Sequence, residues 1–107
     1  MPPELLTLNV EVPFGQSKPS VEVLKSFGRF AVHRSERFGV YGKGDHWDIS
    51  LKPTGERVVP FTFKRRKDAY RVAKLFSRCD SGSKLEENPK AIRLYRAVKY
   101  WFYSCAP

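Results

Sequence analysis

Hydrophobic and polar residues alternate near the N-terminal end of the chain, in the stretch "LLTLNVEVPF". A period of two is typical of a strand with one buried face, so it predicts a strand over residues 5–14. The buried side of this strand would carry Leu6, Leu8, Val10, Val12 and Phe14. The residues that follow, "GQSKPS" (15–20), predict a loop.

The next stretch, "SVEVLKSFG", fits two different elements. Ser20 is a suitable N-cap and Gly28 a suitable C-terminal stop, which favours a short helix. The β-branched Val21 and Val23 lose rotamer freedom in a helix, so a strand stays open as the alternative.

From residue 29 to residue 63 the pattern favours a sheet. Phe30 and Val32 share one face in "RFAVHR", "RFGVYG" follows closely, and "HWDISL" alternates again. "KPTGE" (52–56) has the proline and glycine of a turn, and "RVVPFTF" (57–63) should return as a strand. The last two strands should form a hairpin, with Pro60 at an edge or a bulge because proline cannot donate to the ladder. The connections "SER" and "GKGD" are the expected exposed tips.

Two amphipathic helices are expected after the sheet, over about residues 65–78 and 89–103. The spacing i, i+3, i+4, i+7 of a core face is met in the first helix by Ala69, Val72, Ala73 and Phe76. The second helix begins at Asn88-Pro89, a good N-cap followed by proline at the first helical position. Its core face would carry Ala91, Leu94, Tyr95, Val98, Trp101 and Phe102.

These elements predict an α+β fold, in which a small antiparallel sheet of three to four strands packs against two C-terminal amphipathic helices. One domain spanning residues 1–107 is expected. The composition agrees with a folded chain, because 14% of the residues are aromatic and disordered chains are poor in aromatic residues.

The chain is basic, with 20 Lys and Arg against 11 Asp and Glu and a net charge of +9. Residues 1–60 contain eight Lys or Arg and seven Asp or Glu, whereas residues 61–107 contain twelve and four. Nearly all of the excess therefore lies in the C-terminal part. A concentrated positive charge attracts polyanions such as nucleic acid, an acidic membrane surface or an acidic protein.

The first predicted helix separates its cations from its core face. At about 100° per residue, one stripe lies opposite the core face and contains Lys67, Arg71, Lys74 and Arg78. Three more cations stand where this helix begins: Lys64, Arg65 and Arg66. Like charges at i, i+4 and cations at a helix N-terminus are both unfavourable unless an anion binds. The second helix places Arg93, Arg96 and Tyr100 on its outer face.

The sequence offers few candidates for catalysis or metal binding. The best acid–base pair is His46 and Asp48 in "GKGDHWD", but a glycine-containing hairpin tip whose polar positions face water is the stronger interpretation. Cys79 and Cys105 lack the close ligand pairs of a zinc site. We therefore expect no enzyme activity, no metal and no cofactor.

The sequence also favours a cytoplasmic protein. No apolar run approaches the roughly 18 residues that a membrane span needs, and the first residues lack the pattern of a secretory signal. In a reducing compartment Cys79 and Cys105 are expected to remain thiols.

The segment "HWDISLKPTGERVVPFTFKRRKDAYRVAKLF" (46–76) resembles the small β-β-β-α domains at the N-termini of tyrosine-family integrases and the related plant AP2 type. The matching positions are Trp47, Gly55, Phe63, Lys64 to Lys67, and Asp68-Ala69. In that family the sheet lies in the DNA major groove and the helix packs behind it. The resemblance implies that DNA contacts come from sheet residues, and that the helix stripe is secondary. Those sheet residues would be Arg34, Arg37, Lys52 and Arg57.

The order of elements is also similar to that of double-stranded-RNA-binding domains, whose last helix opens with lysines that contact phosphates. "KRRKDAYRVAK" suits that role, although the glycine-rich motif that precedes it in that family is missing here.

Two functions are consistent with these observations. The first is a small, non-enzymatic protein that binds DNA or RNA and holds its phosphates with a basic helix face. The second is a protein-interaction module or inhibitor, encoded by a phage or mobile element, that docks on an acidic surface of a nucleic-acid-processing machine. In either case the binding residues would include both the first-helix cations and Arg93 and Arg96.

Overall fold

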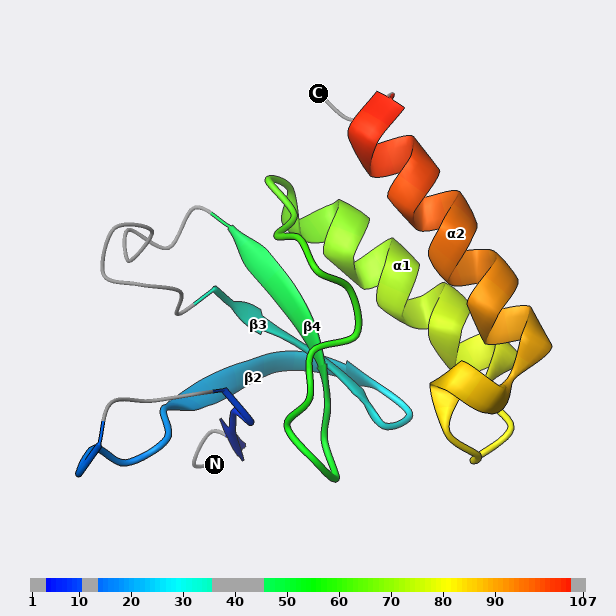
Figure 1. Ribbon diagram of the computed structural model, residues 1–107. Helices are drawn as coiled ribbons and strands as arrows, with labels where there is room; N and C mark the ends of the chain where they lie inside the picture. The colour runs from blue at the N-terminus through cyan, green and yellow to red at the C-terminus, as the bar shows by residue number, and fades with distance from the viewer. Residues whose placement is uncertain (1–3, 11–13, 36–45, 105–107) are drawn as a thin grey trace.

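The computed structural model describes residues 4–10, 14–35 and 46–104. Four strands form one antiparallel sheet in chain order: β1 (Leu5–Thr7), β2 (Ser20–Phe27), β3 (Phe30–Arg34) and β4 (Trp47–Leu51). The helices α1 (Arg66–Cys79) and α2 (Pro89–Ser104) follow, with the short 3-10 helix η1 (Leu85–Glu87) between them. Both helices lie on the same side of the sheet (Figure 1). The predicted α+β fold is confirmed, and each helix begins and ends within one residue of its prediction.

One side of α1 packs on the sheet and forms the main core. The buried residues of α1 are the four that the spacing predicted: Ala69, Val72, Ala73 and Phe76. They share a core cluster with Phe30 and Val32 of β3 and Ile49 of β4, all of which are fully buried. The rings of Phe30 and Phe76 stack with their centroids 5.8 Å apart.

α2 packs on α1 and on the segment that leads into α1. Phe102 stacks on Phe61 with ring centroids 4.0 Å apart, and Trp101 stacks on Phe63 at 6.4 Å. Ala91 and Val98 are buried, and the other predicted core positions are partly buried in the same cluster: Leu94, Tyr95, Trp101 and Phe102. The predicted core face of α2 is confirmed.

Residues 20–27 form a strand, so the expectation of a helix ending at Gly28 is wrong and the alternative is correct. Residues 20–22 of β2 pair with β1, and residues 23–27 pair with β3. A helix would satisfy its own backbone groups and leave those of both neighbours unpaired. An irregularity in register between Val23 and Lys25 lets the strand bend from one partner to the other.

The N-terminal strand is much shorter than the predicted 5–14. Leu6 and Leu8 are buried as expected, but Val10 is 40% exposed and Phe14 is fully exposed. The chain leaves β2 after Thr7 because its backbone finds another partner: the N–H of Asn9 donates to the carbonyl of Gly55 at 2.9 Å. Val12 lies outside the described residues.

Residues 57–63 were expected to form a regular strand, and this expectation is wrong. The turn at 52–56 is present, but the returning chain makes only two isolated antiparallel bridges, Ser50 with Arg57 and Trp47 with Phe63. Pro60 lies between the bridges, where its missing N–H cannot continue a ladder. The predicted strand "RFGVYG" and most of both hairpin tips fall within residues 36–45, outside the described residues.

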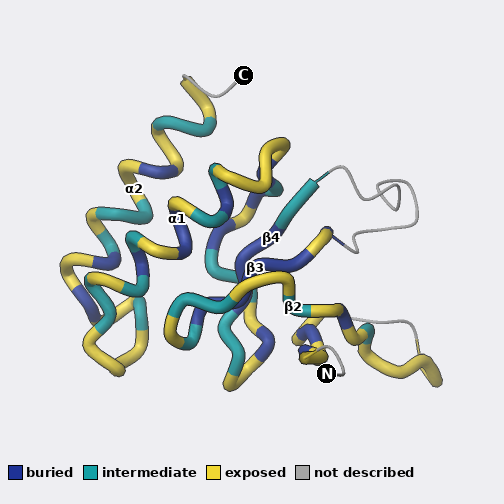
Figure 2. The backbone as a smooth tube through the Cα atoms, turned by 180° about the vertical axis from the view of Figure 1, so that it is seen from behind, coloured by how far each residue is buried: buried dark blue, intermediate teal, exposed yellow. Residues whose placement is uncertain are grey.

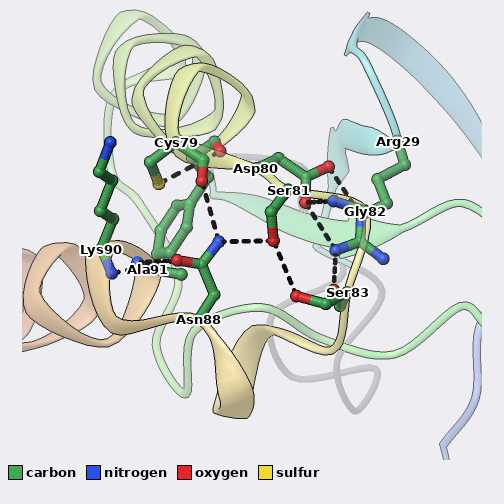
Figure 3. Close-up of polar contacts among 10 residues, drawn as sticks. Arg29, Cys79, Asp80, Ser81, Gly82, Ser83, Asn88, Lys90 and Ala91 are labelled. Carbon is green, nitrogen blue, oxygen red and sulfur yellow. Dashed lines mark hydrogen bonds and ion pairs between the residues drawn. The ribbon is translucent and has the colours of Figure 1, made fainter.

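The connection between α1 and α2 is fixed by two polar side chains (Figure 3). The buried Asn88 caps α2, as predicted: its Oδ1 accepts from the N–H groups of Lys90 and Ala91, while its Nδ2 donates to the carbonyl of Cys79 at 2.9 Å. Asp80 accepts two hydrogen bonds from the guanidinium of Arg29, at 2.7 and 2.9 Å. The β2–β3 turn is thereby tied to the end of α1.

Gly55 joins the turn at 52–56 to the N-terminal segment, and no other residue fits there. Its φ is +72°, and a Cβ would lie 2.1 Å from the carbonyl oxygen of Thr7. We predict that Gly55→Ala lowers the free energy of unfolding in urea by more than the roughly 1–3 kcal/mol of a strained φ. Gly82→Ala is the matched control, since Gly82 has a φ of +83° with nothing within 4 Å. Equal losses in the two variants would contradict the close approach.

Candidate nucleic-acid interface

Seven cations gather around α1, and all are exposed. Five lie on the helix and two just precede it: Lys64, Arg65, Arg66, Lys67, Arg71, Lys74 and Arg78. We call these seven residues the basic face. Among the described residues, no carboxylate lies within ion-pair distance of any of them. The segregation of cations predicted from the helical spacing is present, because the buried side of α1 forces Lys67, Arg71 and the rest of the stripe toward solvent.

The N-terminus of α1 is not capped by a side chain of its N-cap residue. The N-cap is Arg65, whose side chain makes no capping hydrogen bond. The first N–H groups of any helix lack intrahelical partners, and here four consecutive cations surround them. Asp68 is the one acid in the first turn. An anion at this end would meet backbone N–H groups and positive side chains together.

The two predicted cations of α2 are also exposed. Arg93 and Arg96 lie on the outer side of the helix, and the guanidinium of Arg93 donates to the carbonyl of Pro89 at 3.4 Å. Exposed residues run along the outer sides of both helices (Figure 2). Both helices lie on the same side of the sheet, so Arg93 and Arg96 belong to the same helical layer as the basic face.

Tyr70 lies beside the basic face and is half-buried. It meets the ring of Phe27 edge to face, with centroids 5.9 Å apart. Lys25 and Arg66 each lie over the Tyr70 ring, at 5.7 and 5.8 Å. These contacts bring a cation of β2 next to those of α1.

Two of the four cations expected to contact DNA from the sheet form ion pairs within the chain. Lys52 forms an ion pair with Glu4 at 2.7 Å, and Arg57 forms one with the buried Asp48 at 3.0 Å. Arg34 is exposed at the end of β3, and Arg37 lies outside the described residues. Lys52 and Arg57 are therefore already neutralised by carboxylates of the same chain.

The face of β3 and β4 that points away from α1 is buried. It carries Ala31 and His33 opposite Ser50 and Asp48, and none of the four is more than 4% exposed. Leu6, Leu8 and Val21 pack against Ala31. The docking implied by the resemblance to integrase domains needs this face to be open to DNA, and here side chains of the N-terminal segment occupy part of it.

The structure reveals a buried polar pair that the sequence did not suggest. The Nδ1 of His33 lies 2.8 Å from the carbonyl of Arg34, which can only accept, so Nδ1 carries the proton. The Nε2 of His33 then accepts from the hydroxyl of Ser50 at 2.8 Å. Asp48, expected to face water, is buried instead because Arg57 neutralises it. In the sequence, the one sign of this buried polar pair was that polar residues interrupt two otherwise apolar strands.

Within the described part of the chain, no three His, Cys, Asp or Glu side chains lie close enough together to hold a metal ion. The same residues include no helix that is long and apolar enough to cross a membrane. The thiol of Cys79 donates to the carbonyl of Phe76 at 3.4 Å, and Cys105 lies outside the described residues.

Comparison with protein-family models, curated proteins and solved structures found no significant match to this chain.

The buried histidine makes stability depend on pH. Desolvation lowers the pKa of His33 below its usual 6.5, although its hydrogen bond to Arg34 opposes this. Below about pH 6.5 the unfolded chain therefore binds a proton that the folded chain cannot, and the free energy of unfolding falls as the pH falls through this window. Urea titrations between pH 7 and pH 5 should show this decline in the natural protein. His33→Gln should reduce it, and an undiminished decline in that variant would contradict the assignment.

Proposed function

We propose that this protein is a non-enzymatic nucleic-acid-binding protein that holds phosphates with the basic face. The observation that carries the proposal is the set of seven exposed cations without carboxylate partners among the described residues. The three cations that do have such partners are Arg29, Lys52 and Arg57.

The arrangement is unfavourable in the free protein. Lys67 and Arg71 are four residues apart, as are Lys74 and Arg78, and like charges at this spacing destabilise a helix by about 0.2–0.5 kcal/mol per pair. The cations at the uncapped N-terminus of α1 also oppose the helix dipole. Bound phosphates would remove both penalties, which supports a polyanion as the partner.

The length of the stripe suits a nucleic-acid backbone. A helix rises about 1.5 Å per residue, so Lys67 and Arg78 are separated by roughly 16 Å along the axis. One strand of duplex DNA advances about 3.4 Å per phosphate along its axis, so the stripe extends over several consecutive phosphates. Such contacts bind DNA or RNA without reading the bases.

We predict a steep dependence of binding on salt. If about six phosphates are contacted, log K for duplex DNA falls against log salt with a slope near −5. The double variant Arg71→Glu/Lys74→Glu should weaken binding by roughly tenfold or more and flatten the slope, because two phosphate contacts become repulsive. Fluorescence anisotropy over 50–200 mM salt measures both.

Lys18→Glu/Lys84→Glu is the matched control, since it changes the net charge equally at exposed positions outside the basic face. Equal weakening by both double variants would show that net charge, and not the basic face, governs binding. Absence of binding to both DNA and RNA would reject the proposal. A partner retained by the protein from nuclease-treated lysate, and lost in Arg71→Glu/Lys74→Glu, would then identify an acidic protein surface as the target.

A further inference from the structure

A groove runs between α1 and α2 at the border of the basic face. Its volume is about 320 Å³. Leu75 of α1 and Leu94, Ala97 and Trp101 of α2 make it largely apolar. Two charged side chains also line it, Asp68 and Arg71, both from α1. Arg71 therefore belongs to the basic face and to the wall of the groove at once.

We propose that this groove receives an unpaired nucleobase of the strand whose phosphates the basic face holds. The inference rests on the proposed function and makes it specific: the preferred ligand is single-stranded nucleic acid. With Arg71 on a phosphate, the base of an adjacent nucleotide can turn into the groove that the same residue lines.

The apolar side chains of the groove fit the flat surface of a base. Leu75, Leu94 and Trp101 are each only partly buried, so apolar and aromatic surface stays accessible between the helices. Trp101 is fixed in place by its stacking on Phe63. Aromatic and apolar side chains bind unstacked bases in single-stranded nucleic-acid complexes, where they replace the neighbouring bases.

Asp68 supplies a polar contact for the edge of the base. It is the one carboxylate among the groove-lining residues, and it lies among cations that would otherwise favour only phosphate. A carboxylate accepts from the exocyclic amino group of cytosine or adenine. The carbonyl groups of thymine and uracil present oxygen to it instead. The groove should therefore prefer amino-bearing bases.

A duplex cannot use this groove. Its bases are stacked and paired, so none of them can turn into the groove unless the duplex first unpairs and unstacks there. Duplex DNA would thus bind through the basic face alone. Comparing a single-stranded ligand with a duplex therefore tests binding in the groove separately from binding to the basic face.

The first test fills the groove from an exposed position. Ala97 is exposed and lines the groove, so Ala97→Phe should leave the fold intact while occupying the space meant for the base. We expect the affinity for oligo-dC to fall by roughly tenfold and the affinity for duplex DNA to stay within about twofold. Ser104→Phe, which adds the same ring at an exposed position of α2 outside the groove, should bind both ligands as the natural protein does.

The second test observes the groove directly and does not depend on filling it. The chain has two tryptophans, and Trp47→Phe leaves Trp101 as the one reporter. The Nε1 of Trp47 is buried without a hydrogen-bond partner, so removing it sacrifices no such contact. Oligo-dC should change the fluorescence of Trp101, whereas duplex DNA should not. Asp68→Asn should reduce the preference for oligo-dC over oligo-dT.

The outcomes distinguish the two proposals. Salt-dependent duplex binding with no response of Trp101 to oligo-dC, or with oligo-dC affinity unchanged in Ala97→Phe, overturns the groove and leaves the basic face standing. Binding of an apolar peptide in the groove without any binding of oligo-dC overturns the inference as well. Absence of binding to every nucleic acid rejects both.

Discussion

The packing of α1 against β3 and β4 determines the rest of the structure. Phe30 and Phe76 stack across this contact, and both are almost completely buried. A helix whose apolar side is fixed in this way has no rotational freedom, since each residue is displaced by about 100° from the last. The cations of α1 must therefore point to solvent as a group. The positive surface is a direct consequence of where the apolar residues are buried.

The other face of the sheet is closed by different means. The N-terminal segment covers Ala31 with apolar side chains, and hydrogen bonds satisfy the buried His33. Arg57 forms an ion pair with the buried Asp48, whose burial would be very unfavourable without a paired cation. The chain thus uses some of its cations to stabilise the fold and leaves those of α1 exposed. The positions of carboxylates decide which cations remain available to a ligand.

The pairing of α2 with α1 adds a second kind of surface next to the first. The rings of Trp101 and Phe102 fix α2 on residues 61–63, and the crevice left between the helices is apolar with one carboxylate. Arg71 borders this crevice and also belongs to the basic face. The basic face and the apolar crevice therefore adjoin without any loop placing them together.

The sequence by itself determined the elements whose hydrophobic period is long and regular. Both helices were predicted almost to the residue, and so were their buried sides, because spacing at 3.6 residues and the Asn88 cap are local properties. The exposed stripe of cations followed from the same geometry.

Tertiary structure decided the strand pairing and the ion pairs, because these depend on residues that are distant in the chain. Residues 20–27 became a strand because two neighbours needed their backbone groups, and β1 ended early because Asn9 bonded to Gly55. The neutralisation of Lys52 and Arg57 likewise required carboxylates whose proximity no local pattern encodes.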